Sequence, residues 1–428
     1  CIVGSGVCGL VAARQLSDVM DVTIFECRET FGGQWNTSML NDTETPDDDF
    51  AKQIYGHQLS SIYEGMQTLE HSATMNFSDF PSSYSCGYPG AEEVLQYLTD
   101  YVDHFNLRPK MRFNTAVTDI TPLNQNEFQV TTKTLSGAEA TQIFNRVVIA
   151  TGRYSIPYIP EIRGVETFPG RVHHSHNIKR TPRRDEYEGK SVVIVGAFVS
   201  SYEFIRLLTK YEAKRVIVSG IEYGVPVLSH VTDPVFLALR EAGRVVLNKS
   251  IERIEGSLVH FHDSEPLEAD EIILCSGYKF SFPFLKHRVL LEEGRYLDGL
   301  WKGILDMKYP RMAHLSISRC RVFINSEADA KYIRQLFTDE LDLEAMEESQ
   351  QKWFVKQYDP EKPLRRLYIK KYCFLDSVRA TYEDYGLPID NAWLVKIRQL
   401  MEEDDAATIQ RFMHYREAMD TSEIASQT

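Results

Sequence analysis

Three glycines near the start of the chain have the spacing of a dinucleotide-binding loop. Gly4, Gly6 and Gly9 stand in the stretch GSGVCG, and Glu26 follows at the end of the next apolar run. In such a loop the first glycine permits a tight turn, the second lets backbone N–H groups approach a pyrophosphate, and the third lets helix and strand pack closely. A carboxylate at the position of Glu26 can accept ribose hydroxyl hydrogens. We therefore predict a site for FAD or NAD, and this loop alone does not decide between the two.

A second stretch, GAFVSSYEF (196–204), has the same place after an apolar run but an altered composition. It begins with Gly196, yet Phe198 and Ser201 stand where the second and third glycines are expected. A phenyl ring at position 198 obstructs a pyrophosphate unless it points away. Ser200 and Ser201 add hydroxyl donors to the backbone N–H groups of the following helix. We predict a second, modified dinucleotide site that uses Gly196, Ser200 and Ser201.

Both loops need parallel strands and a helix to position them. Apolar runs at 1–3 and 22–25 flank a helix-length segment, and runs at 191–195 and 215–220 flank another, so each loop belongs to a βαβ unit. Further along the chain, 88–107 has helical spacing of its apolar residues, whereas 128–134 and 143–149 alternate as strands do. The run 270–280 is interpreted as a strand that returns the chain to the first unit.

The predicted fold class is therefore α/β, with two Rossmann-like dinucleotide-binding domains, the second inserted into the first. We expect an FAD-binding domain built from residues 1–185 and 286–428, and an NADPH-type domain at residues 190–285. A chain of 428 residues is long enough for two such cores.

Composition excludes several classes of protein. The chain has 47 basic and 61 acidic residues and a net charge of -14, which argues against a nucleic-acid binder. Its 7 cysteines are scattered without a CxxC pair, which favours reduced thiols, a cytoplasmic location and no disulfide reductase chemistry. No apolar run reaches the roughly 18 residues of a membrane span. Because the chain begins inside an apolar run without Met, we expect its true N-terminus to lie upstream.

Several ordered motifs resemble those of flavin-containing monooxygenases. GGQW (32–35) resembles their GGxW element, FPGRVHHSHNIK (168–179) their identifying FxGxxxHS motif, and CSGYKFSFPFL (275–285) their TGYxFxFPFL segment. Similar matches are SIYEGMQTLEHSATMNFSDFP (61–81), VVIATGRY (147–154) and EADAKYIRQLF (327–337). The chain is identified as a divergent class B flavoprotein monooxygenase of the N- and S-oxygenating branch, since no Trp-Pro or Trp-Asp ending follows the FxGxxxHS motif. A metal site at His173, His174 and His176 is a weaker interpretation, because acidic or cysteine partners are absent nearby.

The resemblance implies an activity and its cofactors. In this family FAD is reduced by NADPH, and a C4a-hydroperoxyflavin transfers oxygen from dioxygen to the nitrogen or sulfur of a small lipophilic amine or sulfide. It also implies that Gln34 and Trp35 line the FAD, although Trp35 could instead be a core aromatic residue. No membrane span is expected, and a homodimer is left open.

Three departures from the family pattern leave two functions open. Leu69 stands at the position of the family's active-site Asn, and Thr68 is a partial replacement if the alignment shifts by one residue. Phe198 replaces a glycine, and no arginine follows the run 216–219. One interpretation is a monooxygenase that binds NADPH weakly or prefers NADH. The alternative is an FAD-binding member that has lost nicotinamide binding and acts as a non-oxygenase binding or regulatory protein.

Overall fold

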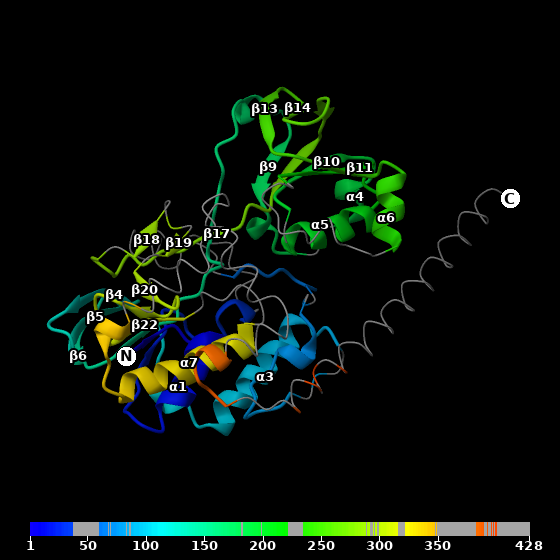
Figure 1. Cartoon of the computed structure of the whole chain (residues 1–428). Coiled ribbons are helices and arrows are strands. Elements are labelled where there is room, and N and C mark those ends of the chain that lie inside the picture. Colours follow the sequence, from blue (N-terminus) through cyan, green and yellow to red (C-terminus); the bar gives the residue numbers. More distant parts are fainter. Residues whose placement is uncertain are drawn as a thin grey trace.

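The chain folds around one mainly parallel sheet and one fully parallel sheet, which form the lower and upper parts of the view in Figure 1. The computed structural model describes residues 1–36, 60–66, 68, 70–82, 84, 87–180, 183–197, 199–220, 234–287, 289–291, 294, 296–297, 299–315, 322–346, 348, 382–388, 392, 395, 397 and 399. None of the helices in these ranges combines the length and apolar character that crossing a bilayer requires.

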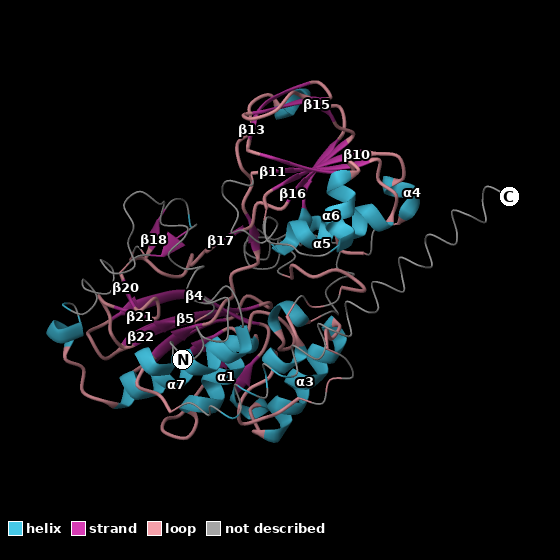
Figure 2. Cartoon of the chain, turned by 45° about the vertical axis from the view of Figure 1, so that its right-hand side comes forward, coloured by secondary structure: helices cyan, strands magenta, loops and turns pink. Residues whose placement is uncertain are grey.

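The first sheet has seven strands, of which the five consecutive strands β22, β7, β1, β2 and β3 are parallel. Helices α1 (Val7–Leu16), α3 (Ala91–His104) and α7 (Val322–Thr338) pack on one face, and an antiparallel meander packs on the other (Figure 2). In order across the sheet the strands are β20 (Leu300–Trp301), β21 (Leu305–Asp306), β22 (Met312–His314), β7 (Val147–Ile149), β1 (Ile2–Val3), β2 (Ile24–Phe25) and β3 (Met111–Arg112). The meander consists of β4 (Thr115–Pro122), β5 (Phe128–Thr134) and β6 (Glu139–Phe144).

The second sheet has five strands, all parallel, and is also covered on both faces. Successive residues of its central strand β10 (Ser191–Val195) alternate between two apolar clusters, because side chains of a strand point to opposite faces. Val192 and Ile194 meet α5 (Val199–Lys210), whereas Val193 meets a small antiparallel sheet. The remaining elements are β12 (Val245–Asn248), β11 (Arg215–Ser219), β16 (Glu271–Leu274), β9 (Arg171–His174), α4 (Arg184–Tyr187), α6 (Pro234–Glu241), β13 (Ile251–Glu255), β14 (Leu258–Phe261) and β15 (Leu267–Glu268).

Two chain segments connect the sheets, and they pair with each other. β8 (Ile156–Pro157) leaves the first domain and β17 (Tyr278–Lys279) returns to it, and the two are antiparallel neighbours. The predicted fold class, two Rossmann-like units with the second inserted into the first, is confirmed. A further short pair, β18 (Leu290–Leu291) and β19 (Tyr296–Leu297), follows the return.

Two predicted boundaries are wrong. The first domain was expected to run to residue 185, but β9 already forms an edge of the second sheet, so the insertion begins nearer to β8. The predicted strand at 143–149 is two strands, β6 and β7, which belong to different sheets and are separated at Asn145 and Arg146. Hydrophobic patterns in one sequence carry no information about the sheet that a strand joins.

Candidate active site

The first glycine loop requires its glycines for close backbone packing. Gly4 has a φ of +99°, and a Cβ atom placed on it would lie 2.6 Å from the carbonyl oxygen of Ala150 at the end of β7. A Cβ on Gly9 would lie 1.9 Å from the carbonyl oxygen of Gly4. The turn after β1 and the close contact of α1 with that turn therefore exclude any side chain at these two positions.

The backbone of this loop touches the backbone of the GGQW stretch. A Cβ on Gly33, where φ is +58°, would lie 2.8 Å from Cα of Gly6, and N–H of Gly32 donates to the carbonyl oxygen of Ser5 over 3.0 Å. No side chain caps the N-terminus of α1, whose N-cap residue is Gly6. The result is a cradle of bare backbone at a helix N-terminus, which has the shape and polarity that suit a pyrophosphate such as that of FAD.

Glu26 is buried beside this cradle at the end of β2. Its Oε2 accepts hydrogen bonds from N–H of Ser5 at 2.8 Å and from the Ser5 hydroxyl at 2.7 Å. Its Oε1 accepts from N–H of Arg28 at 3.1 Å and from the Cys27 thiol at 3.4 Å. The two backbone donors fix the carboxylate, whereas the two side-chain donors can rotate away in favour of another hydroxyl.

Gln34 and Trp35 lie in the short 3-10 helix η1 (Gly33–Trp35) next to the cradle. Trp35 is buried in the apolar cluster that α1, α3 and α7 share, and Gln34 is partly exposed. The carbonyl oxygen of Gln34 accepts a hydrogen bond from the hydroxyl of Ser60 at 2.7 Å. The buried position of Trp35 agrees with the interpretation that it is a core aromatic residue. Its contact with a flavin stays a prediction.

Residues 60–66, called the bridging segment below, connect the first domain to the second. The ammonium of Lys179 donates to the carbonyl oxygen of Ser60 at 2.5 Å, and N–H of Glu64 donates to the carbonyl oxygen of Lys179 at 2.8 Å. Burial lowers the pKa of Lys179 to about 8, and the like charge of Arg28 adds to this shift. Tyr63 packs among the apolar residues of the second domain and donates its hydroxyl to Glu203 on α5.

The predicted catalytic positions lie directly after the bridging segment. Thr68 is buried; its N–H donates to the carbonyl oxygen of Pro89 at 3.0 Å and its hydroxyl to that of Glu70 at 2.9 Å. Leu69 lies outside the described residues. The role assigned to either residue stays a prediction.

The second glycine loop retains the tight turn of the first loop but has a serine where its helix packs against that turn. Gly196 has a φ of +117°, and a Cβ there would lie 2.4 Å from the carbonyl oxygen of Cys275. Ser201 is fully buried and donates its hydroxyl to the carbonyl oxygen of Gly196 at 2.8 Å. A serine thus occupies the space between helix and turn that only a glycine fits in the first loop. Of the two predicted serine donors, only Ser200 is exposed and available to a ligand. Phe198 lies outside the described residues.

The FxGxxxHS motif joins β9 to the returning segment at β17. A Cβ on Gly170 would lie 2.2 Å from the carbonyl oxygen of Asp270. His174 accepts from N–H of His176 at Nδ1, so its Nε2 carries the proton and donates to the carbonyl oxygen of Gly277, both at 3.0 Å. Burial lowers the pKa of His174 to about 4, which keeps this tautomer neutral. His173 instead contacts Glu271, so the neighbouring histidines face different partners.

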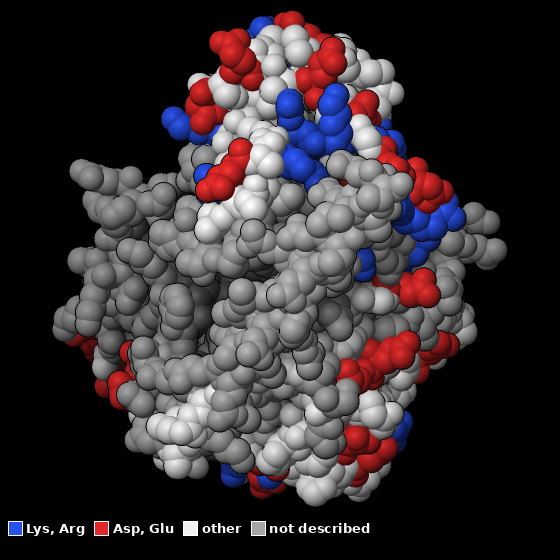
Figure 3. Space-filling model, turned by 90° about the vertical axis from the view of Figure 1, so that its right-hand side faces the viewer, with Lys and Arg blue, Asp and Glu red and all other residues white. Residues whose placement is uncertain are grey.

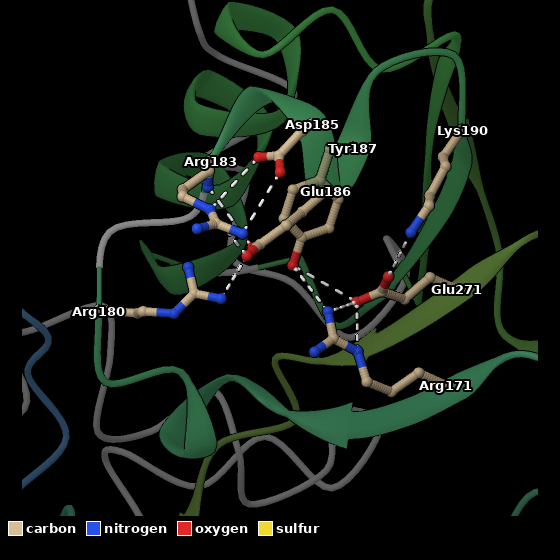
Figure 4. A network of polar contacts seen from close by, with 8 residues as sticks. All are labelled: Arg171, Arg180, Arg183, Asp185, Glu186, Tyr187, Lys190 and Glu271. Atoms are coloured by element: carbon tan, nitrogen blue, oxygen red, sulfur yellow. Dashed lines mark hydrogen bonds and ion pairs between the residues drawn. The ribbon is translucent and has the colours of Figure 1, made fainter.

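Glu271 anchors the amino ends of the strands in the second sheet (Figure 4). Its carboxylate contacts Arg171, Lys190 and the hydroxyl of Tyr187. Burial opposes its ionisation, but hydrogen bonds from His173 and Arg171 and the charge of Arg171 lower the pKa of Glu271 overall. This network lies at the amino-terminal ends of the strands, whereas the glycine loop follows their carboxyl ends. It therefore stabilises the second domain away from the nucleotide side.

Basic side chains gather on the second domain in the view of Figure 3. Many of the arginines near α4 have acidic partners: Arg183 pairs with Asp185, and Arg184 pairs with Glu188 and Glu212. These ion pairs are exposed, and they offset the positive charge of the patch.

Sequence reasoning missed the contacts between the two domains. Lys179 ends a motif that the sequence does single out, but nothing in its spacing indicates that its ammonium reaches Ser60. Tyr63 and Glu203 each lie in a recognisable stretch, and no pattern in one chain links the two. Only the continuous apolar run at 191–195 and the glycine spacing were signals strong enough to locate the loops themselves.

Comparison with known proteins identifies the family of the chain. A family model described as flavin-binding monooxygenase-like matches residues 1–238. The chain is 29% identical over 326 residues to a trimethylamine monooxygenase from Pelagibacter ubique (strain HTCC1002), covering 74% of this chain and 69% of that protein. It is 30% identical over 377 residues to the flavin-containing monooxygenase FMO GS-OX-like 8 from Arabidopsis thaliana, covering 82% and 77%. The solved structure of S-allyl-L-cysteine S-oxygenase from Allium sativum superposes with a TM-score of 0.74 at 23% identity, covering 95% of this chain and 92% of that one.

Proposed function

Because the chain belongs to the flavin-binding monooxygenase-like family, we propose that it uses FAD, NADPH and dioxygen to oxygenate the nitrogen or sulfur of a small lipophilic amine or sulfide. The observation that carries this proposal is the backbone cradle between Gly6 and Gly33, with the buried Glu26 beside it. The names of two relatives, a trimethylamine monooxygenase and an S-allyl-L-cysteine S-oxygenase, supply one nitrogen and one sulfur compound as substrate precedents.

The first domain holds FAD in this proposal. Gly4, Gly6 and Gly9 admit the pyrophosphate to the N-terminus of α1, and Glu26 accepts a ribose hydroxyl hydrogen in place of the Ser5 hydroxyl or the Cys27 thiol. Gln34 and Trp35 form the wall that follows the cradle. When bound, FAD supplies the electron transfer and the activation of dioxygen, and the side chains supply position and exclusion of water.

The second domain, from about β8 to β17, holds NADPH in this proposal. The Gly196 turn and the start of α5 present backbone N–H groups, and the exposed Ser200 adds a hydroxyl donor. The bridging segment, through Tyr63 and Lys179, holds the second domain against the first. The task of this segment is to keep the two dinucleotide loops at a fixed separation, which would orient the cofactors toward each other when both are bound.

The decisive experiment follows the flavin absorbance band of the purified protein without oxygen. Addition of NADPH is expected to bleach the band, and later addition of oxygen with trimethylamine or an alkyl sulfide is expected to yield the N-oxide or sulfoxide. Bleaching followed only by hydrogen peroxide would show a reductase that does not oxygenate these substrates. A flavin that stays oxidised in NADPH would refute the proposal and favour the alternative of a non-oxygenase flavoprotein.

A further inference from the structure

The carboxyl ends of β11 and β12 form a corner at the nucleotide side of the second sheet. Ser219 and Asn248 are register partners, and N–H of Gly220 donates to the carbonyl oxygen of Asn248 at 3.1 Å. We call Ser219, Gly220, Asn248 and Lys249 the strand-end corner. In dinucleotide-binding domains the end of the second strand faces the 2′ position of the adenosine ribose, and β11 is that strand here.

The end of β11 itself offers no cation and no free hydroxyl to such a ribose. Ser219 is buried, and its hydroxyl donates to the carbonyl oxygen of Lys249 at 3.2 Å. Gly220 has no side chain. Among the described residues at this corner, a group that recognises the 2′ position can come from the end of the neighbouring strand, β12, and from the residue after it.

Asn248 is buried at the end of β12 with an unsatisfied donor. Its side chain is 3% exposed, and its amide nitrogen Nδ2 has no hydrogen-bond partner among the residues that the structure describes. A buried amide without an acceptor is unusual in a folded protein, and a missing ligand atom is one of the few explanations for it. The amide is therefore available to an acceptor that enters this corner.

Lys249 follows Asn248 and is exposed. Within the described part of the chain its ammonium forms no ion pair, although most arginines near α4 do. Its N–H donates to Oδ1 of Asp263 at 2.9 Å, so an acidic side chain shares the corner and reduces its positive charge.

We propose that Lys249 binds the 2′-phosphate of NADPH and that the Asn248 amide donates a hydrogen bond to an oxygen of the same ribose phosphate. This rests on the proposed function, in which NADPH is the reductant. The cation directly after β12 takes the place of the arginine that is absent at the end of β11. Asp263 opposes the phosphate and weakens its binding.

The test is equilibrium titration calorimetry of the FAD-loaded protein with NADP⁺ and with NAD⁺. We expect the wild type to bind NADP⁺ more tightly, and Lys249→Ala to weaken NADP⁺ about tenfold, as loss of a charge-assisted contact does, with NAD⁺ affinity unchanged. Lys249→Arg should restore the preference, and Asp263→Asn should strengthen NADP⁺ binding. The matched control is Lys214→Ala, since Lys214 is an exposed lysine just before β11, at the opposite edge of the sheet.

The outcomes separate this inference from the proposed function. Equal losses for both nucleotides, no loss for Lys249→Ala, a wild type that prefers NAD⁺, or a wild type that binds neither would each overturn the assignment of Lys249. Because binding is measured without turnover, a protein that shows the expected pattern but makes no oxygenated product would refute only the oxygenase activity.

Discussion

The hydroxyl of Tyr63 donates a hydrogen bond to Oε1 of Glu203 at 2.9 Å, although the two residues lie far apart in the sequence. Tyr63 comes from the bridging segment of the first domain, and Glu203 from the helix that begins at the second glycine loop. Burial and the carboxylate of Glu203 raise the pKa of Tyr63, so the phenol stays protonated and remains the donor. The contact therefore couples the domain that we assign to FAD with the loop that we assign to NADPH.

Removing the Tyr63 hydroxyl should slow the reduction of FAD by NADPH more than it destabilises the fold. Tyr63→Phe is expected to lower the free energy of unfolding by about 1.5 kcal/mol and to slow the reduction of FAD by NADPH several-fold, with FAD retention unchanged. Rapid-mixing absorbance under anaerobic conditions measures the rate. Tyr84→Phe is the matched control, because the Tyr84 hydroxyl donates to the carbonyl oxygen of Met75 within the first domain. Equal slowing in both variants would contradict a coupling role.

The backbone cradle gives a prediction about FAD retention. Gly33→Ala places a Cβ 2.8 Å from Cα of Gly6 at a positive φ, so it should reduce FAD affinity at least about tenfold and destabilise the apoprotein by about 1 kcal/mol or more. Gly137→Ala shares the positive φ but meets no atom within 4 Å, so it should cost stability alone. The flavin-to-protein absorbance ratio after gel filtration measures retention. Full retention in Gly33→Ala would show that the flavin lies elsewhere.

The two serines of the second loop should separate into a ligand contact and a structural contact. Ser201→Ala removes the buried hydrogen bond to Gly196 and is expected to cost about 1 kcal/mol of stability with little change in NADP⁺ affinity. Ser200→Ala should leave the melting temperature unchanged and weaken NADP⁺ a few-fold, because Ser200 is exposed at the start of α5. Thermal melting and calorimetry give the two readings, and the reverse pattern would exchange the roles of the serines.

Acid sensitivity should follow from two buried histidines. Burial lowers the pKa of His174 to about 4 and that of His314 to about 4, from an ordinary value of 6.5. The unfolded chain binds protons that the folded chain does not, so this contribution to stability is complete above pH 6.5 and is lost as the pH falls toward 4. Each histidine accounts for up to roughly 3 kcal/mol.

Denaturant unfolding as a function of pH measures this loss. His174→Asn is expected to flatten the curve between pH 6.5 and 4, whereas a change of the exposed His262 to Gln should not. An unchanged slope in His174→Asn would mean that other groups control the acid transition.

Local patterns predicted the elements of this fold well, because short stretches of sequence determine strands and glycine turns. The apolar run at 191–195 is β10, the alternating run at 128–134 is β5, and the glycines at 4 and 9 have the packing roles expected from their spacing. The family resemblance and the flavin that it implies are confirmed by the family match.

The parts that sequence could not predict depend on where distant segments meet. Nothing near β9 indicates that it joins the second sheet, since the strand pattern is the same in either sheet. The hydroxyl of Ser201 was expected to face a nucleotide but donates inside the turn, because a buried hydroxyl takes the nearest acceptor. Leu69 and Phe198, the two departures that matter most for activity, lie outside the described residues, so their consequences stay predictions.

The pairing of β8 with β17 makes the connection between the domains a two-stranded ribbon instead of two independent linkers. His174 adds a cross-link to the ribbon through the carbonyl oxygen of Gly277. A protease that cuts the chain within either strand therefore leaves the other strand, and the contacts of the bridging segment, to keep the fragments together. Limited proteolysis would release separate domains only after both strands had been cut.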